Sequence, residues 1–143
     1  MKISIVGSLD FAYEMKEIAE KLINLGFEVD LPPTAKMILE KEIASEQIKK
    51  EKEDGSFSQR VIDSDAIRRY WKIMQNSDAV LVVNFDKKGI KGYVGGNSFL
   101  EMGFAHVLNK KIYLLNDIPD MGYKDEIEAM QPIILNGELN KII

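Results

Sequence analysis

The sequence of 143 residues predicts a doubly wound α/β domain, in which a five-stranded parallel sheet lies between two layers of helices. Two observations predict this fold. Short β-branched runs alternate with segments whose apolar residues recur at helical spacing. Residues 79–83 are apolar without interruption, which is typical of a strand buried on both faces of a parallel sheet. Since the length is that of a common domain, we expect one domain over residues 1–143.

The expected elements alternate along the chain. Strands are expected at residues 2–6, 27–31, 79–83, 111–115 and 132–135. Helices are expected at residues 11–23, 34–53, 61–75, 98–108 and 125–130, the second of them a solvent-facing helix with a thin apolar stripe. Residues 54–58 have the composition of a loop and are a candidate lid or partner contact. This order predicts a flavodoxin-like or Rossmann-like arrangement in three layers.

Composition narrows the possible chemistry. The chain has no cysteine and a single histidine, His106, which argues against thiol catalysis, a zinc centre and a Ser-His-Asp triad, so we expect no metal or other cofactor. The formal net charge of -4 argues against a nucleic-acid polymer as partner and favours a small molecule. Since the sequence has no apolar run of membrane-spanning length and no secretory signal pattern, we expect a cytoplasmic protein without membrane association.

Ligands of such sheets bind beyond the carboxyl ends of the strands, which here points to the loops at residues 7–10, 84–101 and 116–125. Gly95 and Gly96 allow the backbone to approach a ligand closely, and the amides that follow at the start of a helix favour a phosphate or a polar sugar group. The segment is neither a Walker loop nor a dinucleotide-binding fingerprint. The segment from Gly95 to Glu101 is therefore the candidate reaction centre.

Each candidate residue also has a structural alternative. Ser98 and Glu101 fit a capping box, in which both side chains satisfy amides at the helix start. Asn97 and Ser98 can each be a simple N-cap, and His106 is most simply a surface or packing residue. Gly7-Ser8 can either hold a phosphate oxygen or only form a tight turn.

Several motifs resemble the nucleoside 2-deoxyribosyltransferase family. They are Ile5-Val-Gly-Ser8, Ser77-Asp-Ala-Val-Leu-Val-Val83, the glycine loop, Glu101-Met-Gly-Phe-Ala105 and Asn109-Lys-Lys-Ile-Tyr113, which together extend over most of the chain. In that family a glutamate of the Glu-x-Gly-x-Ala helix attacks the anomeric carbon of a deoxyribonucleoside. The resemblance places Glu101 in this role. The candidate residues around the substrate are Gly7, Ser8, Asp86, Gly95, Gly96, Asn97 and Ser98.

The chain departs from the family at two assisting carboxylates. Gly95 stands where the transferases have an aspartate, and Tyr70 aligns with a second aspartate. Asp86 and Asp65 are nearby in sequence and are candidates to replace them.

Related enzymes widen the expected substrate class. The segment is also similar to that of 2'-deoxynucleoside 5'-monophosphate N-glycosidases, hydrolases in which small hydroxyl and amide groups hold the phosphate, and Ser8 fits their Gly-Ser loop. It resembles more loosely the phosphoribohydrolase motif, with Val94 in place of a proline. The resemblance implies cleavage or transfer at the N-glycosidic bond of a nucleoside or nucleotide by an enzyme without metal.

Two alternatives stay open: a nucleotide-binding or sensing module that has lost its assisting carboxylates, and an assembly domain without a ligand. Family members are commonly homo-oligomers, dimers or larger, in which the region after the fourth strand often completes a partner's site. The resemblance implies this role for Tyr123, Lys124 and Asp125, and an ordinary surface loop is the alternative.

Overall fold

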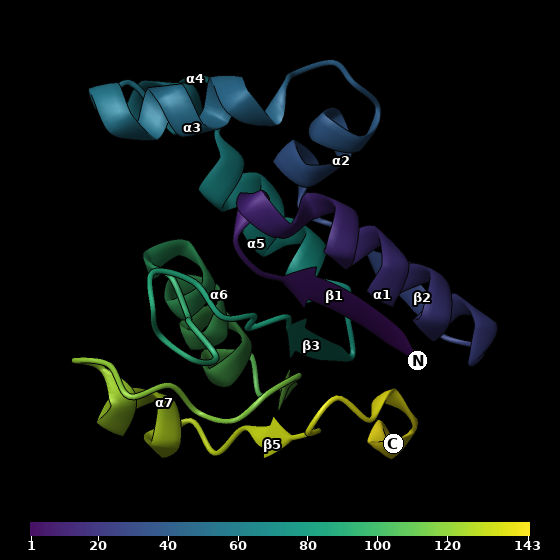
Figure 1. The fold of residues 1–143 in the computed structure, drawn as a ribbon. Coiled ribbons are helices and arrows are strands. Elements are labelled where there is room, and N and C mark those ends of the chain that lie inside the picture. The colour runs from purple at the N-terminus through teal and green to yellow at the C-terminus, as the bar shows by residue number, and fades with distance from the viewer.

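The computed structural model describes all 143 residues and contains a five-stranded sheet whose strands are all parallel, in the order β2-β1-β3-β4-β5 (Figure 1). The strands are β1 Lys2–Val6, β2 Glu28–Asp30, β3 Ala79–Val82, β4 Lys111–Leu114 and β5 Ile133–Ile134. The helices are α1 Ala12–Asn24, α2 Pro33–Leu39, α3 Ser45–Asp54, α4 Phe57–Asp63, α5 Ala66–Gln75, α6 Gly96–Val107 and α7 Lys124–Ala129, with two short 3-10 helices, η1 Leu9–Phe11 and η2 Leu139–Lys141. This architecture confirms the predicted three-layer α/β fold.

Two separate apolar cores cover the two faces of the sheet. On one face, β1, β3 and β4 pack against α1, α2, α3 and the C-terminal segment, around residues such as Ile3, Met15 and Ile48. On the other face the strands pack against α5, α6 and α7, around Tyr70, Met102 and Ile127. Because consecutive strand residues face opposite sides, Val80 and Leu81 enter different cores. None of the helices is long and apolar enough to cross a membrane.

The helix expected at residues 34–53 is wrong as a single element, because the chain turns between α2 and α3. Lys41 adopts a positive φ of 59° in this turn. In one continuous helix Ile38 and Ile48 would lie about 15 Å apart along the axis. The turn brings both side chains into the same core, where Ile38 is 2% and Ile48 1% exposed.

The helix expected at residues 61–75 is also divided. It is interrupted after Asp63, where the Ser64 hydroxyl donates to the Arg60 carbonyl at 2.7 Å and Asp65 takes a left-handed φ of 48°. A serine that bonds back to its own helix and a left-handed residue both disfavour continuation. The expected loop at residues 54–58 is correspondingly shorter, since α4 begins at Phe57.

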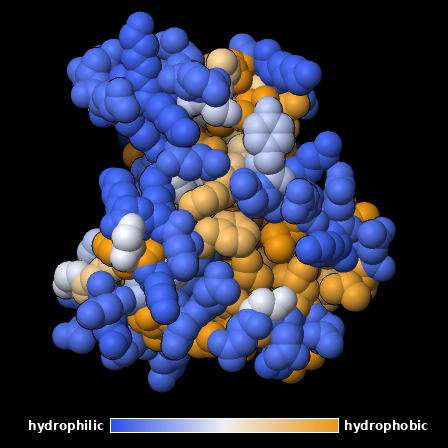
Figure 2. Space-filling view, in the orientation of Figure 1, coloured by the Kyte–Doolittle hydropathy of each residue, from blue (hydrophilic) through white to orange (hydrophobic).

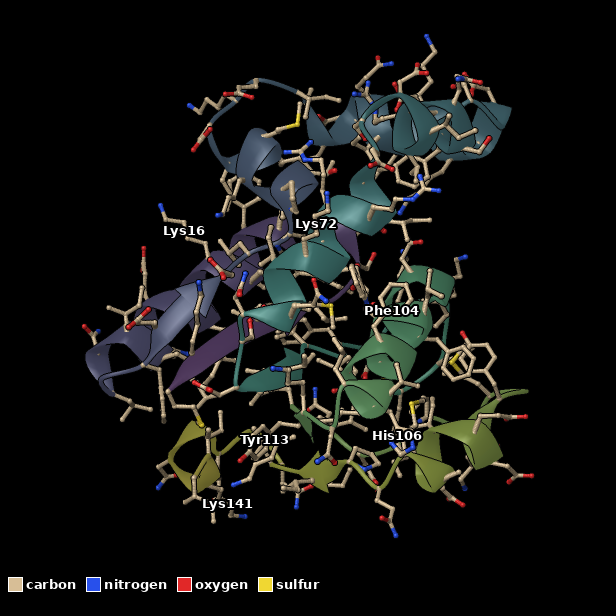
Figure 3. The ribbon with its side chains drawn as sticks, turned by 180° about the vertical axis from the view of Figure 1, so that it is seen from behind. Lys16, Lys72, Phe104, His106, Tyr113 and Lys141 are labelled. Atoms are coloured by element: carbon tan, nitrogen blue, oxygen red, sulfur yellow. The ribbon has the colours of Figure 1, made fainter.

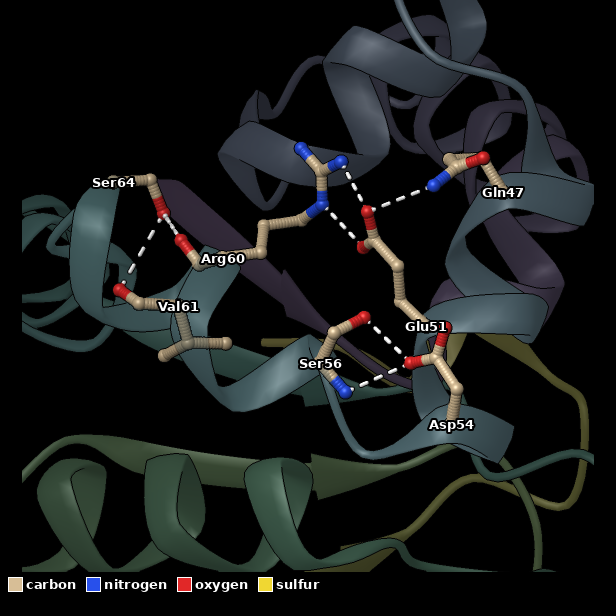
Figure 4. Close-up of polar contacts among 7 residues, drawn as sticks. All are labelled: Gln47, Glu51, Asp54, Ser56, Arg60, Val61 and Ser64. Atoms are coloured by element: carbon tan, nitrogen blue, oxygen red, sulfur yellow. Dashed lines mark hydrogen bonds and ion pairs between the residues drawn. The ribbon is translucent and has the colours of Figure 1, made fainter.

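The helices α3 and α4 form a hairpin, here called the cap, which stands away from the sheet at one end of the molecule (Figure 1). The Arg60 guanidinium donates two hydrogen bonds of 2.5 Å to the Glu51 carboxylate, which also accepts one from Gln47 (Figure 4). This pairing lowers the pKa of Glu51 to about 2. The pair joins α4 to α3, while Ile48 of α3 packs into the core beneath.

Asn84 joins two loops that leave the carboxyl ends of β3 and β4. It is 1% exposed, and its side-chain amide donates to the carbonyls of Gly92, Asn116 and Asp117 at 3.3, 3.2 and 2.9 Å. Its amide oxygen accepts from the Asn116 backbone at 2.9 Å. Asn84 therefore holds in place the loop that leads into α6.

Replacing Asn84 tests this role. Asn84→Ala leaves several buried backbone groups without partners, so we expect it to lower the free energy of unfolding by about 1–3 kcal/mol. Denaturant unfolding measures the change, and Asn140→Ala, at an exposed position, is the control. A loss equal to that of the control contradicts the assigned role.

Candidate functional site

The helix α6 begins two residues earlier than expected, and this decides the capping question. Its N-cap is Gly95 and its first residue is Gly96, so Ser98 lies in the third helical position and Glu101 in the second turn. A capping box needs the serine at the N-cap and the glutamate three residues later. Glu101 therefore does not cap its own helix, and Asn97 and Ser98 are not N-caps.

Glu101 lines a cavity between the cap, α5 and α6, at the carboxyl end of β1. The cavity has a volume of about 60 Å³. Phe104 lines it, whereas His106, two residues later in the last turn of α6, lies near α7 and is exposed (Figure 3). The residues that line the Glu101 cavity come from the loop after β1 and from α2, α4, α5 and α6. They are Gly7, Leu9, Pro32, Pro33, Thr34, Phe57, Val61, Ala66, Ile67, Tyr70, Asn97, Leu100, Glu101 and Phe104.

The walls of this cavity are mostly apolar. Figure 2, in the orientation of Figure 1, shows apolar surface at the centre of the molecule, below the hydrophilic side chains of the cap. Ligand pockets typically have volumes of roughly 300 Å³ or more. The cavity is therefore smaller than a typical ligand pocket, and Phe57 and Val61 of the cap form part of its wall.

The Glu101 carboxyl group has unusual electrostatics. Burial raises its pKa to about 8, and neither a hydrogen bond nor a neighbouring charge contributes to that shift. It is the only carboxyl group in the cavity lining. At neutral pH the group is therefore mostly protonated, and it is poised to ionise close to physiological pH.

Tyr70 is the other titratable group of the cavity. Its ring is buried, and its hydroxyl donates to the Ile5 carbonyl at the end of β1. Burial, with a smaller contribution from the Glu101 charge, holds the pKa of Tyr70 well above its usual range. Tyr70 therefore stays protonated and is no substitute for a carboxylate that accepts a proton.

The structure brings Gly7 and Asn97 to the same cavity as Glu101. Gly7 is required there by close packing, because a β-carbon at this position would lie 2.5 Å from Cγ2 of Val83 and 2.9 Å from Cε of Met15. Asn97 lies one helical turn before Glu101 and so shares its face of α6.

The other expected binding residues lie around the cavity or apart from it. Ser8 caps η1 and accepts a hydrogen bond of 2.9 Å from Lys87. Gly95, Gly96 and Ser98 form the start of α6, with Ser98 buried and Gly96 in an apolar surface groove. Asp86 lies in a different cavity, where it accepts from the Gly92 amide at 2.9 Å.

The candidate replacements for the family's aspartates do not line the Glu101 cavity. Asp86 is turned into the second cavity, and Asp65 pairs with Arg68 at 3.0 Å on the surface. No group of three or more His, Asp or Glu residues is arranged to hold a metal ion.

Sequence reasoning missed most of the cavity wall. Leu100 and Phe104 flank Glu101 on α6 and could have been found from helical spacing. Thr34, Phe57 and Ile67 come from helices between β2 and β3, and no local pattern indicates that these helices fold over the carboxyl end of β1.

Comparisons with protein-family models, with curated proteins and with solved structures find no match to this chain. The resemblance to nucleoside 2-deoxyribosyltransferases therefore stays a prediction from the motifs.

The raised pKa of the Glu101 carboxyl group predicts how the stability of the fold depends on pH. In the unfolded chain Glu101 ionises near its usual pKa of 4.5, whereas in the fold it stays protonated up to about 8. Between these values the folded state holds one more proton, so ionisation of Glu101 costs stability as pH rises. Glu101→Gln removes that cost, and we expect it to be at least about 1 kcal/mol more stable than wild type at pH 9 and close to neutral at pH 4.5.

Thermal or denaturant unfolding across this pH range measures the difference between the two proteins. Glu126→Gln, at an exposed position on α7, controls for the loss of one surface charge. A difference between Glu101→Gln and wild type that does not change with pH contradicts the raised pKa.

Proposed function

We propose that this protein cleaves the N-glycosidic bond of a nucleoside or nucleotide, with Glu101 as the nucleophile, in the manner of nucleoside 2-deoxyribosyltransferases. The observation that carries the proposal is an unpaired carboxyl group in an apolar cavity beside the amino terminus of α6. The glutamate motif of the sequence falls on this group. A carboxyl without a structural partner is available for a reacting atom.

The proposed chemistry uses a single carboxylate. An ionised Glu101 oxygen attacks the anomeric carbon as the C–N bond breaks, and the bonding electron pair leaves with the base, which takes a proton from solvent. The product is a glycosyl ester on Glu101. Water or a second base then attacks the same carbon, gives up a proton to solvent and releases the carboxylate, which gives hydrolysis or transfer.

Burial of the nucleophile supports this chemistry. In an apolar cavity a carboxylate is poorly solvated, so positive charge that develops on the sugar stabilises it more than it would in water. Tyr70, held protonated beside β1, contributes to the same wall.

A binding or sensing module is the second candidate, and one observation favours it. The cavity lining contains no second carboxyl group that could assist the leaving base or the incoming water. The same cavity would then bind a nucleotide without turnover.

Activity of the Glu101→Gln variant separates the two candidates. For the enzyme we expect a loss of at least about 10³-fold in kcat/KM on a panel of deoxynucleosides and deoxynucleotides, assayed with and without an acceptor base, since the amide cannot form the ester. Glu126→Gln should retain wild-type activity. Binding of a panel member by wild type without any cleavage contradicts the enzyme and supports the module.

The pH profile tests the protonation state that the nucleophile needs. Because the carboxylate is the reactive form, kcat/KM should rise with pH to a plateau, with a midpoint near pH 8 set by the pKa of Glu101. A profile that falls through the same midpoint assigns Glu101 as a proton donor and contradicts its role as nucleophile.

We further propose that the protein forms a homo-oligomer through the outer face of α6, in the cytoplasm. This face carries an apolar groove lined by Phe99, Leu100, Phe104, Val107 and Met130, and Val107 is 77% exposed. Since Leu100 and Phe104 line both this groove and the Glu101 cavity, a second copy here would lie next to the reaction centre.

Val107→Glu places a charge on this face, so we expect it to convert the oligomer into a monomer without loss of folding. Light scattering coupled to size exclusion measures the mass of both proteins. A wild-type protein that is monomeric at high concentration contradicts the oligomer.

A further inference from the structure

The ammonium group of Lys52 lies where the cap meets the loops at the edge of the sheet. Lys52 belongs to α3, which packs beside η1, and its side chain is exposed. The ammonium lies 5.2 Å from the centre of the Phe57 ring, and no carboxylate forms an ion pair with it. A ring contact at an exposed site favours the charged amine only weakly. The amine of Lys52 is therefore accessible and is not engaged by an acid.

Two other lysines act on this amine from the loop after β3. Partial burial of the ammonium and the positive charge of Lys87 lower the pKa of Lys52. Lys88 acts in the same direction and Asp10 in the opposite one. The ammonium groups of Lys87 and Lys88 each lie 5.6 Å from the centre of the Tyr93 ring, so one aromatic ring holds both in the same region. The Lys52 amine therefore faces two like charges that favour its neutral form.

Asp10 is the carboxylate that acts on Lys52, and it already has a partner. The Lys87 ammonium lies 2.8 Å from the Asp10 carboxylate and 2.9 Å from the Ser8 hydroxyl. Three lysines, Lys52, Lys87 and Lys88, against this one carboxylate leave a formal excess of two positive charges. The surroundings of Lys52 therefore stay positive in spite of Asp10.

These surroundings favour a reactive amine. A lysine becomes a nucleophile when it loses its proton, and desolvation and a neighbouring cation both promote that loss. Both of these act on Lys52. The excess positive charge also attracts anionic reagents. An acyl phosphate combines negative charge with an acyl carbon that an amine can attack, so it is the class of reagent that suits Lys52.

We propose that Lys52 is a site of acylation, at Nζ, by small acyl phosphates. After the ammonium has lost a proton to solvent, the neutral amine attacks the acyl carbon, and the bond from that carbon to the bridging oxygen breaks. The electron pair leaves with the phosphate, which takes a further proton from the nitrogen. The products are an amide at Lys52 and inorganic phosphate, and the positive charge of Lys52 is lost. This chemistry uses neither Glu101 nor glycosidic cleavage, so it stands or falls separately from the proposed function.

Competition between two lysines of one helix tests the proposal. The folded protein is incubated with acetyl phosphate near neutral pH, and peptide mass spectrometry follows acetylation at each lysine. Lys50 is the internal control, because it is exposed on the same helix and its side chain points about 200° away from that of Lys52. Acetylation of Lys52 should be at least about fivefold faster than that of Lys50. A lower ratio overturns the proposal.

Charge variants with opposite expected effects test the cause of the reactivity. Lys87→Met and Lys88→Met each remove a like charge, so they should slow acetylation of Lys52 by about twofold or more. Asp10→Asn removes the opposing charge and should speed the same reaction. Lys91→Met, on the same loop but outside the groups that act on Lys52, should leave the rate unchanged. A Lys52 rate that neither Lys87→Met nor Lys88→Met lowers overturns the proposal.

Reaction of the unfolded chain separates the effect of the fold from that of the local sequence. In guanidinium chloride the faster reaction of Lys52 should disappear, because Lys87 and Lys88 then no longer lie beside it. A preference for Lys52 that persists in the unfolded chain arises from the local sequence and overturns the proposal. Since Lys88 is exposed, Lys88→Met decides the question alone if Lys87→Met fails to fold.

Discussion

The carboxyl group of Glu101 lies among apolar walls, and burial raises its pKa to about 8 without any compensating hydrogen bond or counter-ion. Withdrawing such a group from water costs free energy, so it persists only where the surrounding packing holds it in place. The fold supplies that packing from α6, whose buried face includes Met102 and Ala105 and lies next to the face that lines the cavity. The burial that makes the Glu101 carboxyl group destabilising also raises its pKa to a value near neutral pH.

The position of Glu101 depends on how α6 begins. The loop from β3 is held by Asn84, which bonds the loop to the end of β4, and by Val94, which is fully buried and whose carbonyl accepts from the Tyr123 hydroxyl. Tyr123 in turn stacks on Phe99 of α6, with ring centres 4.5 Å apart. Contacts far along the chain therefore fix the first turn of the helix, and the second turn carries Glu101 into the cavity.

Sequence alone predicted the sheet well, because the sequences of strands such as β1 and β3 are short β-branched runs bounded by turn residues. It predicted the region between β2 and β3 poorly, since two long helices were expected there and the structure has four shorter ones. The break at Lys41 serves the joint burial of Ile38 and Ile48, a tertiary demand without a local pattern. After the break at Asp65, α5 packs onto the other face of the sheet. The site shows the same division: Gly7, Asn97 and Glu101 were expected and lie together, whereas the wall from the cap could only be seen once the chain was folded.

The cap, whose two helices are joined by the Glu51–Arg60 pair, contributes Phe57 and Val61 to the wall of a cavity of about 60 Å³. A crystal structure of the protein with a bound deoxynucleoside 5'-monophosphate tests the central claim most directly. We predict a Glu101 carboxylate oxygen about 3–3.5 Å from the anomeric carbon, on the face opposite the base, as near-attack geometry requires. A nucleotide bound elsewhere, or one whose sugar is turned away from Glu101, would contradict it.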